Sequence, residues 1–124
     1  MKFKSILLTI AAIGVACGSA SGANLLDKDF LDFWSNFKGA LQKNDKEALA
    51  TMTKLPYDFD GQKLNRAAFI KQEEKIFPAS VRKRLLKEKP VADKGSVFVF
   101  CGDDIYVFSK DNGKYKFTEI GAND

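Results

Sequence analysis

The chain has 124 residues, of which 45% are hydrophobic and 29% charged, and its formal net charge at pH 7 is +4. This length suits one domain. A balance of 20 basic against 16 acidic residues gives no electrostatic case for a nucleic acid as partner. The chain contains no histidine, the commonest general base and a common metal ligand. Histidine-dependent triads, zinc sites and histidine-bound haem are therefore disfavoured, and no metal or cofactor is predicted.

Residues 1–23 have the pattern of a secretory signal peptide. Lys2 and Lys4 precede an apolar run from Ile6 to Val15, and small residues follow it. A run of about 7 to 15 apolar residues is typical of such a signal, whereas a transmembrane helix needs about 20. The pattern predicts a protein that is exported to the periplasm or secreted.

The small residues after the apolar run allow two forms of processing. Ser21 and Ala23 satisfy the small-x-small rule for cleavage before Asn24. The mature protein is then a single domain, residues 24–124, with 18 basic and 16 acidic residues and a charge of +2. The alternative is lipidation of Cys17, which would make the protein a membrane-anchored lipoprotein.

A helix is predicted from Asp27 to Lys43, because apolar residues recur there at three- and four-residue steps. These residues are Leu26, Phe30, Phe33, Trp34, Phe37 and Leu41. A second, short helix is expected to begin with Asn44 as its N-cap and Glu47 completing a capping box, and to stop at Pro56.

The middle of the chain predicts a hairpin followed by two more helices. Alternation from Leu55 to Phe59 indicates a short strand, which can pair with a second at Gln62 to Leu64. Helical spacing returns from Arg66 and ends at Pro78. We expect Ser80 to cap a further helix that runs to about Lys89.

The last third of the chain predicts a three-stranded antiparallel meander. Its strands are expected at Ser96–Cys101, Ile105–Ser109 and Lys114–Ile120, joined by short turns rich in Gly, Asp and Asn. The run Val97–Phe100 is apolar at every position, which predicts a strand covered on both faces. The same setting predicts that Cys101 is a buried thiol.

The fold class is therefore α+β, with N-terminal helices packed on a curved antiparallel sheet that ends in the meander. This order resembles the nuclear-transport-factor-like, or cystatin-like cone, superfamily, and small exported bacterial members of it in particular. The segments that carry the resemblance are Phe33–Phe37, Asn44–Leu49, Leu55–Tyr57, Phe69–Phe77, Val107–Phe108 and Gly113–Phe117. It implies a pocket inside the cone and homodimers formed through the sheet.

Candidate pocket residues are Trp34, Tyr57, Asp58 and Tyr106. Some relatives in this superfamily are enzymes, for instance ketosteroid isomerase with its aspartate base, and that precedent raises a catalytic interpretation of Asp58 or Asp60. Both flank an Asp-Gly turn, where solvation is the simpler interpretation. No catalytic residue is therefore assigned, and the protein is not predicted to be an enzyme.

Three functions remain open. The first is a non-catalytic binding or interaction module of the bacterial cell envelope, which takes a small apolar ligand in the cone or meets an envelope protein through the sheet. The second is a small isomerase, dehydratase or hydrolase that uses an aspartate base. The third is a structural envelope protein anchored through Cys17, the one form in which we expect membrane contact.

Overall fold

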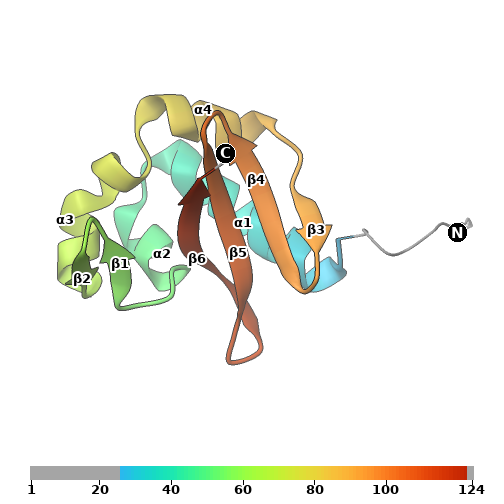
Figure 1. The fold of residues 1–124 in the computed structure, drawn as a ribbon, viewed down its shortest axis with the longest axis horizontal. Coiled ribbons are helices and arrows are strands. Elements are labelled where there is room, and N and C mark those ends of the chain that lie inside the picture. Colours follow the sequence, from blue (N-terminus) through green and yellow to red (C-terminus); the bar gives the residue numbers. More distant parts are fainter. Residues whose placement is uncertain (1–25, 123–124) are drawn as a thin grey trace, which may run out of the picture.

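The computed structural model describes residues 26–122, and over this range the chain is an α+β protein (Figure 1). The helices are α1 (Lys28–Lys43), α2 (Lys46–Thr51), α3 (Arg66–Ile76) and α4 (Ala79–Lys87). The strands are β1 (Tyr57–Phe59), β2 (Gln62–Leu64), β3 (Val91–Asp93), β4 (Ser96–Cys101), β5 (Asp104–Asp111) and β6 (Lys114–Ala122). The predicted signal peptide, its cleavage site and Cys17 lie outside the described residues.

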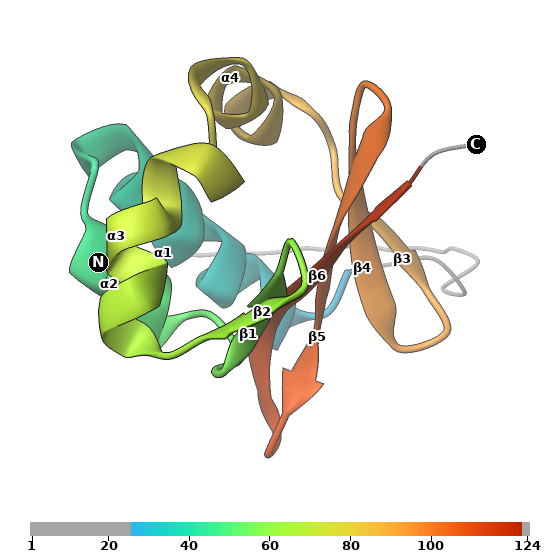
Figure 2. The ribbon, with the colours of Figure 1, turned by 60° about the vertical axis from the view of Figure 1, so that its left-hand side comes forward.

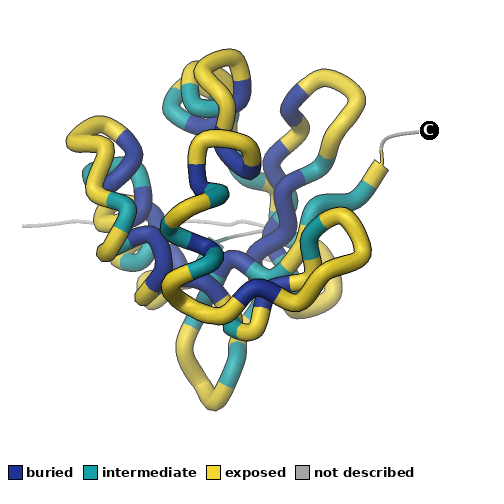
Figure 3. Tube along the Cα trace, turned by 90° about the vertical axis from the view of Figure 1, so that its left-hand side faces the viewer, coloured by how far each residue is buried: buried dark blue, intermediate teal, exposed yellow. Residues whose placement is uncertain are grey.

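The helices gather on one face of a twisted four-stranded sheet (Figure 2). This sheet is antiparallel in the order β3-β4-β5-β6, and β1 and β2 form a separate antiparallel hairpin. Buried positions concentrate in the middle of the molecule, between helices and sheet (Figure 3). Within the described range, no helix has the length and apolar character needed to cross a membrane.

Helix α1 confirms the predicted apolar stripe. Asp27 caps it by accepting a hydrogen bond of 2.7 Å from the Phe30 amide. The prediction for the next helix was wrong by one residue. Asn44 takes a left-handed conformation (φ 60°) and ends α1, while Asp45 caps α2 by accepting from the Ala48 amide at 3.1 Å. Asn tolerates this conformation well, which explains why it closes one helix and does not open the next.

The predicted cap of α4 was also wrong. Ser80 lies inside the helix, and Pro78 occupies the N-cap position without a side-chain hydrogen bond. Proline disfavours a helical conformation in the residue before it, so the chain turns at Phe77 and helix geometry starts directly after the proline. The same effect of Pro90 disfavours helical geometry at Lys89, and α4 ends at Lys87 with the extended Glu88 as its C-cap.

The predicted hairpin is confirmed, although β1 begins at Tyr57 and not at Leu55. The three strands of the meander are also confirmed, but the sheet has a fourth strand. Strand β3 pairs Val91 with Phe98 and Asp93 with Ser96. It has only three residues and no alternating pattern of its own, so its pairing with β4 defines it.

A β-bulge between β5 and β6 sets which residues face the helices. The register shifts between Val107 and Phe108, and the Thr118 hydroxyl donates a hydrogen bond of 3.2 Å to the Val107 carbonyl. Thr118 is the extra residue of β6. It allows Phe117 to lie opposite Phe108 and Ile120 to lie opposite Tyr106, with all four on the inner face. Without it, strict alternation would turn Glu119 inward after Phe117.

A buried ion pair joins α3 to α4. The Glu73 side chain is fully buried, and the Arg82 guanidinium donates one hydrogen bond to its Oε2 and another of 3.1 Å to the Leu41 carbonyl. Glu73 Oε1 has no partner. Burial raises the pKa of the Glu73 carboxyl, and the nearby Arg82 charge opposes that shift. Arg82 thus holds the C-terminal end of α1 and the middle of α3 against α4.

Replacing Arg82 with Met should leave the Glu73 carboxylate buried without a cation. We expect the free energy of unfolding at pH 7 to fall by about 3 kcal/mol, as for other buried ion pairs that lose one partner. Because the pKa of Glu73 is raised in the folded state, the folded protein binds a proton at a higher pH than the unfolded chain does. The loss should therefore shrink as pH falls toward the ordinary pKa of glutamate, about 4.3.

Urea unfolding of Arg82→Met and wild type at several pH values measures this effect. Lys63→Met is the matched control, because Lys63 pairs with Asp58 at 2.9 Å on the surface, where both side chains are more than 70% exposed. The control should change stability by less than about 0.5 kcal/mol. An equal loss in both variants would contradict the role assigned to Glu73.

Candidate functional site

The space between α1 and the sheet, where the resemblance implied a pocket, is filled with aromatic rings. Four α1 rings meet Phe108 of β5 edge-on, with centroid distances of 5.2 Å for Phe37, 5.3 Å for Trp34, 5.8 Å for Phe33 and 6.3 Å for Phe30. Edge-to-face contacts of this kind are favourable beyond the area they bury. They fill the space between α1 and the inner face of the sheet.

A second group of rings surrounds Phe117 of β6. Its ring lies 5.1 Å from Phe77, 5.2 Å from Tyr57 and 5.6 Å from Tyr106. Phe117 also contacts Phe108 at 5.7 Å, which joins the two groups into one core. The interior between the helices and the sheet is therefore a packed aromatic core.

The four predicted site residues do not come together as one site. Trp34 is buried among the α1 rings. Tyr57, Asp58 and Tyr106 line one open groove of about 460 Å³ between β1 and the β5–β6 pair. The two tyrosines are only 2% exposed, and burial raises the pKa of each phenol. Asp58 is exposed and bound to Lys63, which fits the solvated interpretation of this residue.

Tyr106 has a structural bond in this groove, because its hydroxyl donates to the Ile76 carbonyl at the end of α3. Tyr106→Phe should leave that carbonyl unpaired and lower the free energy of unfolding by about 1–3 kcal/mol. Asp58→Asn should change it by less than about 0.5 kcal/mol. Chemical unfolding of both variants measures this. A larger loss for Asp58→Asn would show that its carboxylate has a role beyond the surface ion pair.

Cys101 is a buried free thiol at the end of β4, as its sequence setting predicted. Burial raises the pKa of this thiol to about 11, so it stays protonated at neutral pH. Within residues 26–122, no group of three or more Cys, Asp or Glu residues is placed to hold a metal ion.

The outer face of the sheet, turned away from the helices, carries a row of apolar side chains. The prediction that β4 is covered on both faces was wrong: Val97, Val99 and Cys101 join the core, while Phe100 is 41% exposed. Phe98 alternates with the buried positions and is half-buried outside the core cluster. Within residues 26–122 the fold has two packed layers, and no third layer covers this face.

The strand register extends this apolar surface across neighbouring strands. Phe98 lies opposite Val107 of β5 and Val91 of β3, and Phe100 lies opposite Ile105. Residues directly opposite share one face of a sheet. Val91 is 44% exposed, and Val107 is buried without belonging to the core cluster. We call Val91, Phe98, Phe100, Ile105 and Val107 the outer apolar face.

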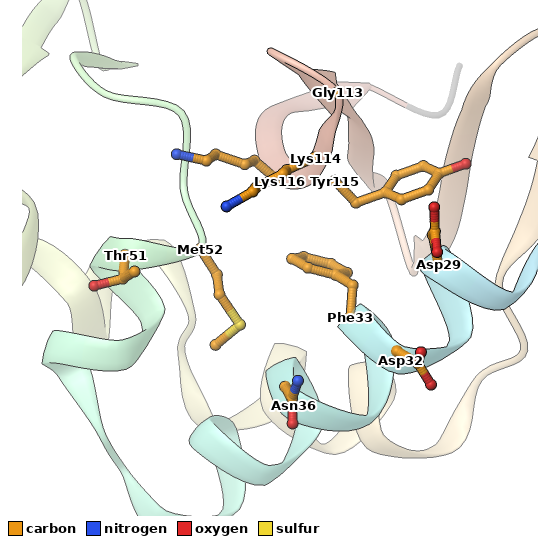
Figure 4. A pocket seen from close by; sticks show the side chains of 10 residues that line it. All are labelled: Asp29, Asp32, Phe33, Asn36, Thr51, Met52, Gly113, Lys114, Tyr115 and Lys116. Atoms are coloured by element: carbon orange, nitrogen blue, oxygen red, sulfur yellow. The ribbon is translucent and has the colours of Figure 1, made fainter.

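A groove of about 470 Å³ lies on the other side of the molecule, between α1, the end of α2 and the β5–β6 hairpin (Figure 4). Phe33 and Met52 form its apolar floor. Lys114 and Lys116 project from the hairpin on the side away from Tyr115, and Thr51 also lines the groove. The sequence did not single out this groove, because its residues come from three distant segments and only the fold brings them together.

The groove has a rigid frame on its α2 side. The Phe117 amide donates a hydrogen bond of 2.8 Å to the Met52 carbonyl, and the Lys54 amide donates one of 2.9 Å to the Phe117 carbonyl. These bonds attach the segment after α2 to the free edge of β6. They hold Met52 and the hairpin at a fixed separation.

Comparisons with protein-family models, curated proteins and solved structures found no match for the chain. The resemblance to the nuclear-transport-factor-like superfamily stays a prediction from the sequence. Any function must therefore be argued from the surfaces and grooves described above.

Proposed function

We propose that the mature protein is an exported, non-catalytic interaction module of the cell envelope, which meets a protein through the outer apolar face. The observation that carries this proposal is the exposure of Phe100 and Val91 beside Phe98 and Ile105 on a sheet whose inner face is already fully used. Contiguous exposed apolar side chains are typical of interaction surfaces. The aromatic filling of the cone disfavours the alternative of a small apolar ligand held inside it.

A second copy of the chain is the partner that we propose for this face. A two-fold axis parallel to the strands, between β4 and β5, would place Phe98 over Val107 and Phe100 over Ile105 of the second copy. Each large ring then meets a smaller side chain, which is how layers interdigitate in a packed interface. Such self-complementary contact is the usual basis of symmetric dimers.

The polar row next to this face supports the same arrangement. Ser96 and Ser109 lie opposite each other on β4 and β5, and their hydroxyls are 2.8 Å apart. The proposed axis sets this row on the same row of the second copy, so polar groups meet polar groups. An axis across the strands would instead place Ser96 against Phe100.

Phe100→Lys should abolish self-association, because burying an unpaired ammonium in an apolar interface is costly. The monomer should fold normally, since this side chain is already exposed. Sedimentation velocity over a range of concentrations should show a dimer for wild type and a monomer for the variant. Leu31→Lys is the matched control, because Leu31 is 49% exposed on α1, away from the sheet. A wild type that is monomeric throughout, or a dimer that Phe100→Lys leaves unchanged, would overturn the proposed partner.

Export gives a separate prediction. Mass spectrometry of the protein purified from a bacterial envelope should find a chain that starts at Asn24, because Ser21 and Ala23 fit the cleavage rule. An acylated chain that starts at Cys17 would support the lipoprotein alternative instead. A chain that retains Met1 in the cytoplasm would contradict export altogether.

A further inference from the structure

The groove of Figure 4 has opposite charges at its two ends. Asp29 and Asp32 line it on the α1 side, and Lys114 and Lys116 line it on the hairpin side. The Asp32 carboxylate pairs with Lys28 at 2.9 Å, whereas the side chains of Asp29 and both lysines make no hydrogen bond or ion pair with the described part of the chain. The unpaired charges are therefore free to meet a ligand.

The side chains between the two ends are apolar. Phe33 lies in the middle of the groove, and Met52 faces it from the end of α2 (Figure 4). Tyr115 turns toward Asp29, on the opposite side from its two lysine neighbours. Methionine adapts to irregular partners, and a volume of about 470 Å³ falls within the range of small-ligand sites, about 300–1,000 Å³.

We propose that this groove binds a short peptide with free termini. Its ammonium group pairs with Asp29 and Asp32, its carboxylate lies between Lys114 and Lys116, and an apolar central side chain packs on Phe33. The ligand is zwitterionic because both ends of the groove must be matched in charge. A ligand that carries only a carboxylate would place its uncharged end against Asp29 and Asp32.

The length of the groove selects the length of the peptide. Asp29 and Asn36 line it seven residues apart on α1, which corresponds to about 10 Å at 1.5 Å per residue. Three residues of extended chain span about 10 Å. A free amino acid is too short to cover this span along α1. The side-chain amide of Asn36 also makes no hydrogen bond within residues 26–122, so it is available to the peptide backbone.

NMR titration with Ala-Phe-Ala near pH 6.5, where a terminal amine is charged, tests the proposal. N-acetylation or C-amidation of the peptide should each weaken binding by about twofold to fivefold, the effect of one exposed ion pair. Ala-Gly-Ala should bind about tenfold more weakly or not at all, because the apolar contact is lost. Equal affinity for the free and both capped peptides, or no binding of any of them, would overturn the proposal.

Two sets of substitutions assign the ends of the ligand. The double variant Lys114→Gln, Lys116→Gln should weaken binding of the free peptide but not of the amidated peptide. The double variant Asp29→Asn, Asp32→Asn should weaken binding of the free peptide but not of the acetylated peptide. Lys110→Gln is the control, because Lys110 belongs to the same hairpin but lies over the Tyr115 ring at 5.4 Å, outside the groove. A loss of the same size for Lys110→Gln would show that hairpin charge as a whole is responsible. Phe100→Lys should bind the peptide normally, so this test is independent of the sheet-mediated dimer.

Discussion

The packing of the α1 aromatic rings against Phe108 is the contact on which the rest of the structure depends. Phe30, Trp34 and Phe37 reach this one ring from successive turns of the helix, and the bulge before Phe108 places it opposite Phe117 on the face that receives them. Since this contact uses one side of the sheet, the apolar residues on the other side lie outside the core, and Phe100 and Val91 among them stay exposed. The filled interior and the exposed outer apolar face therefore have one cause.

The elements that depend on local pattern could be predicted from the sequence. The apolar stripe of α1 and the hairpin at β1 and β2 are confirmed because spacing and turn residues determine them. The errors occur where neighbouring residues compete for one role. Asn44 and Asp45 are both suitable caps, and backbone conformation divides the roles between them. Strand β3 could not be predicted because it depends on its partner, β4.

The candidate sites were harder to predict than the elements. Tyr57 and Tyr106 line one groove with Asp58, but the two rings belong to the core, and Asp58 lies in solvent. An apolar run such as Val97–Phe100 indicates a strand without saying whether one or two layers cover it. The groove joins residues more than 80 positions apart in the chain, a proximity that no local pattern contains.

Trp34 is the only tryptophan of the chain, and it sits where α1 meets the sheet. Its indole is 5% exposed and stacks between Phe30 and Phe37, so its fluorescence is an intrinsic signal for docking of this helix. The outer apolar face lies on the far side of the sheet from this ring. One optical signal thus follows the folding of the core, while assembly through the sheet has to be followed by mass or size.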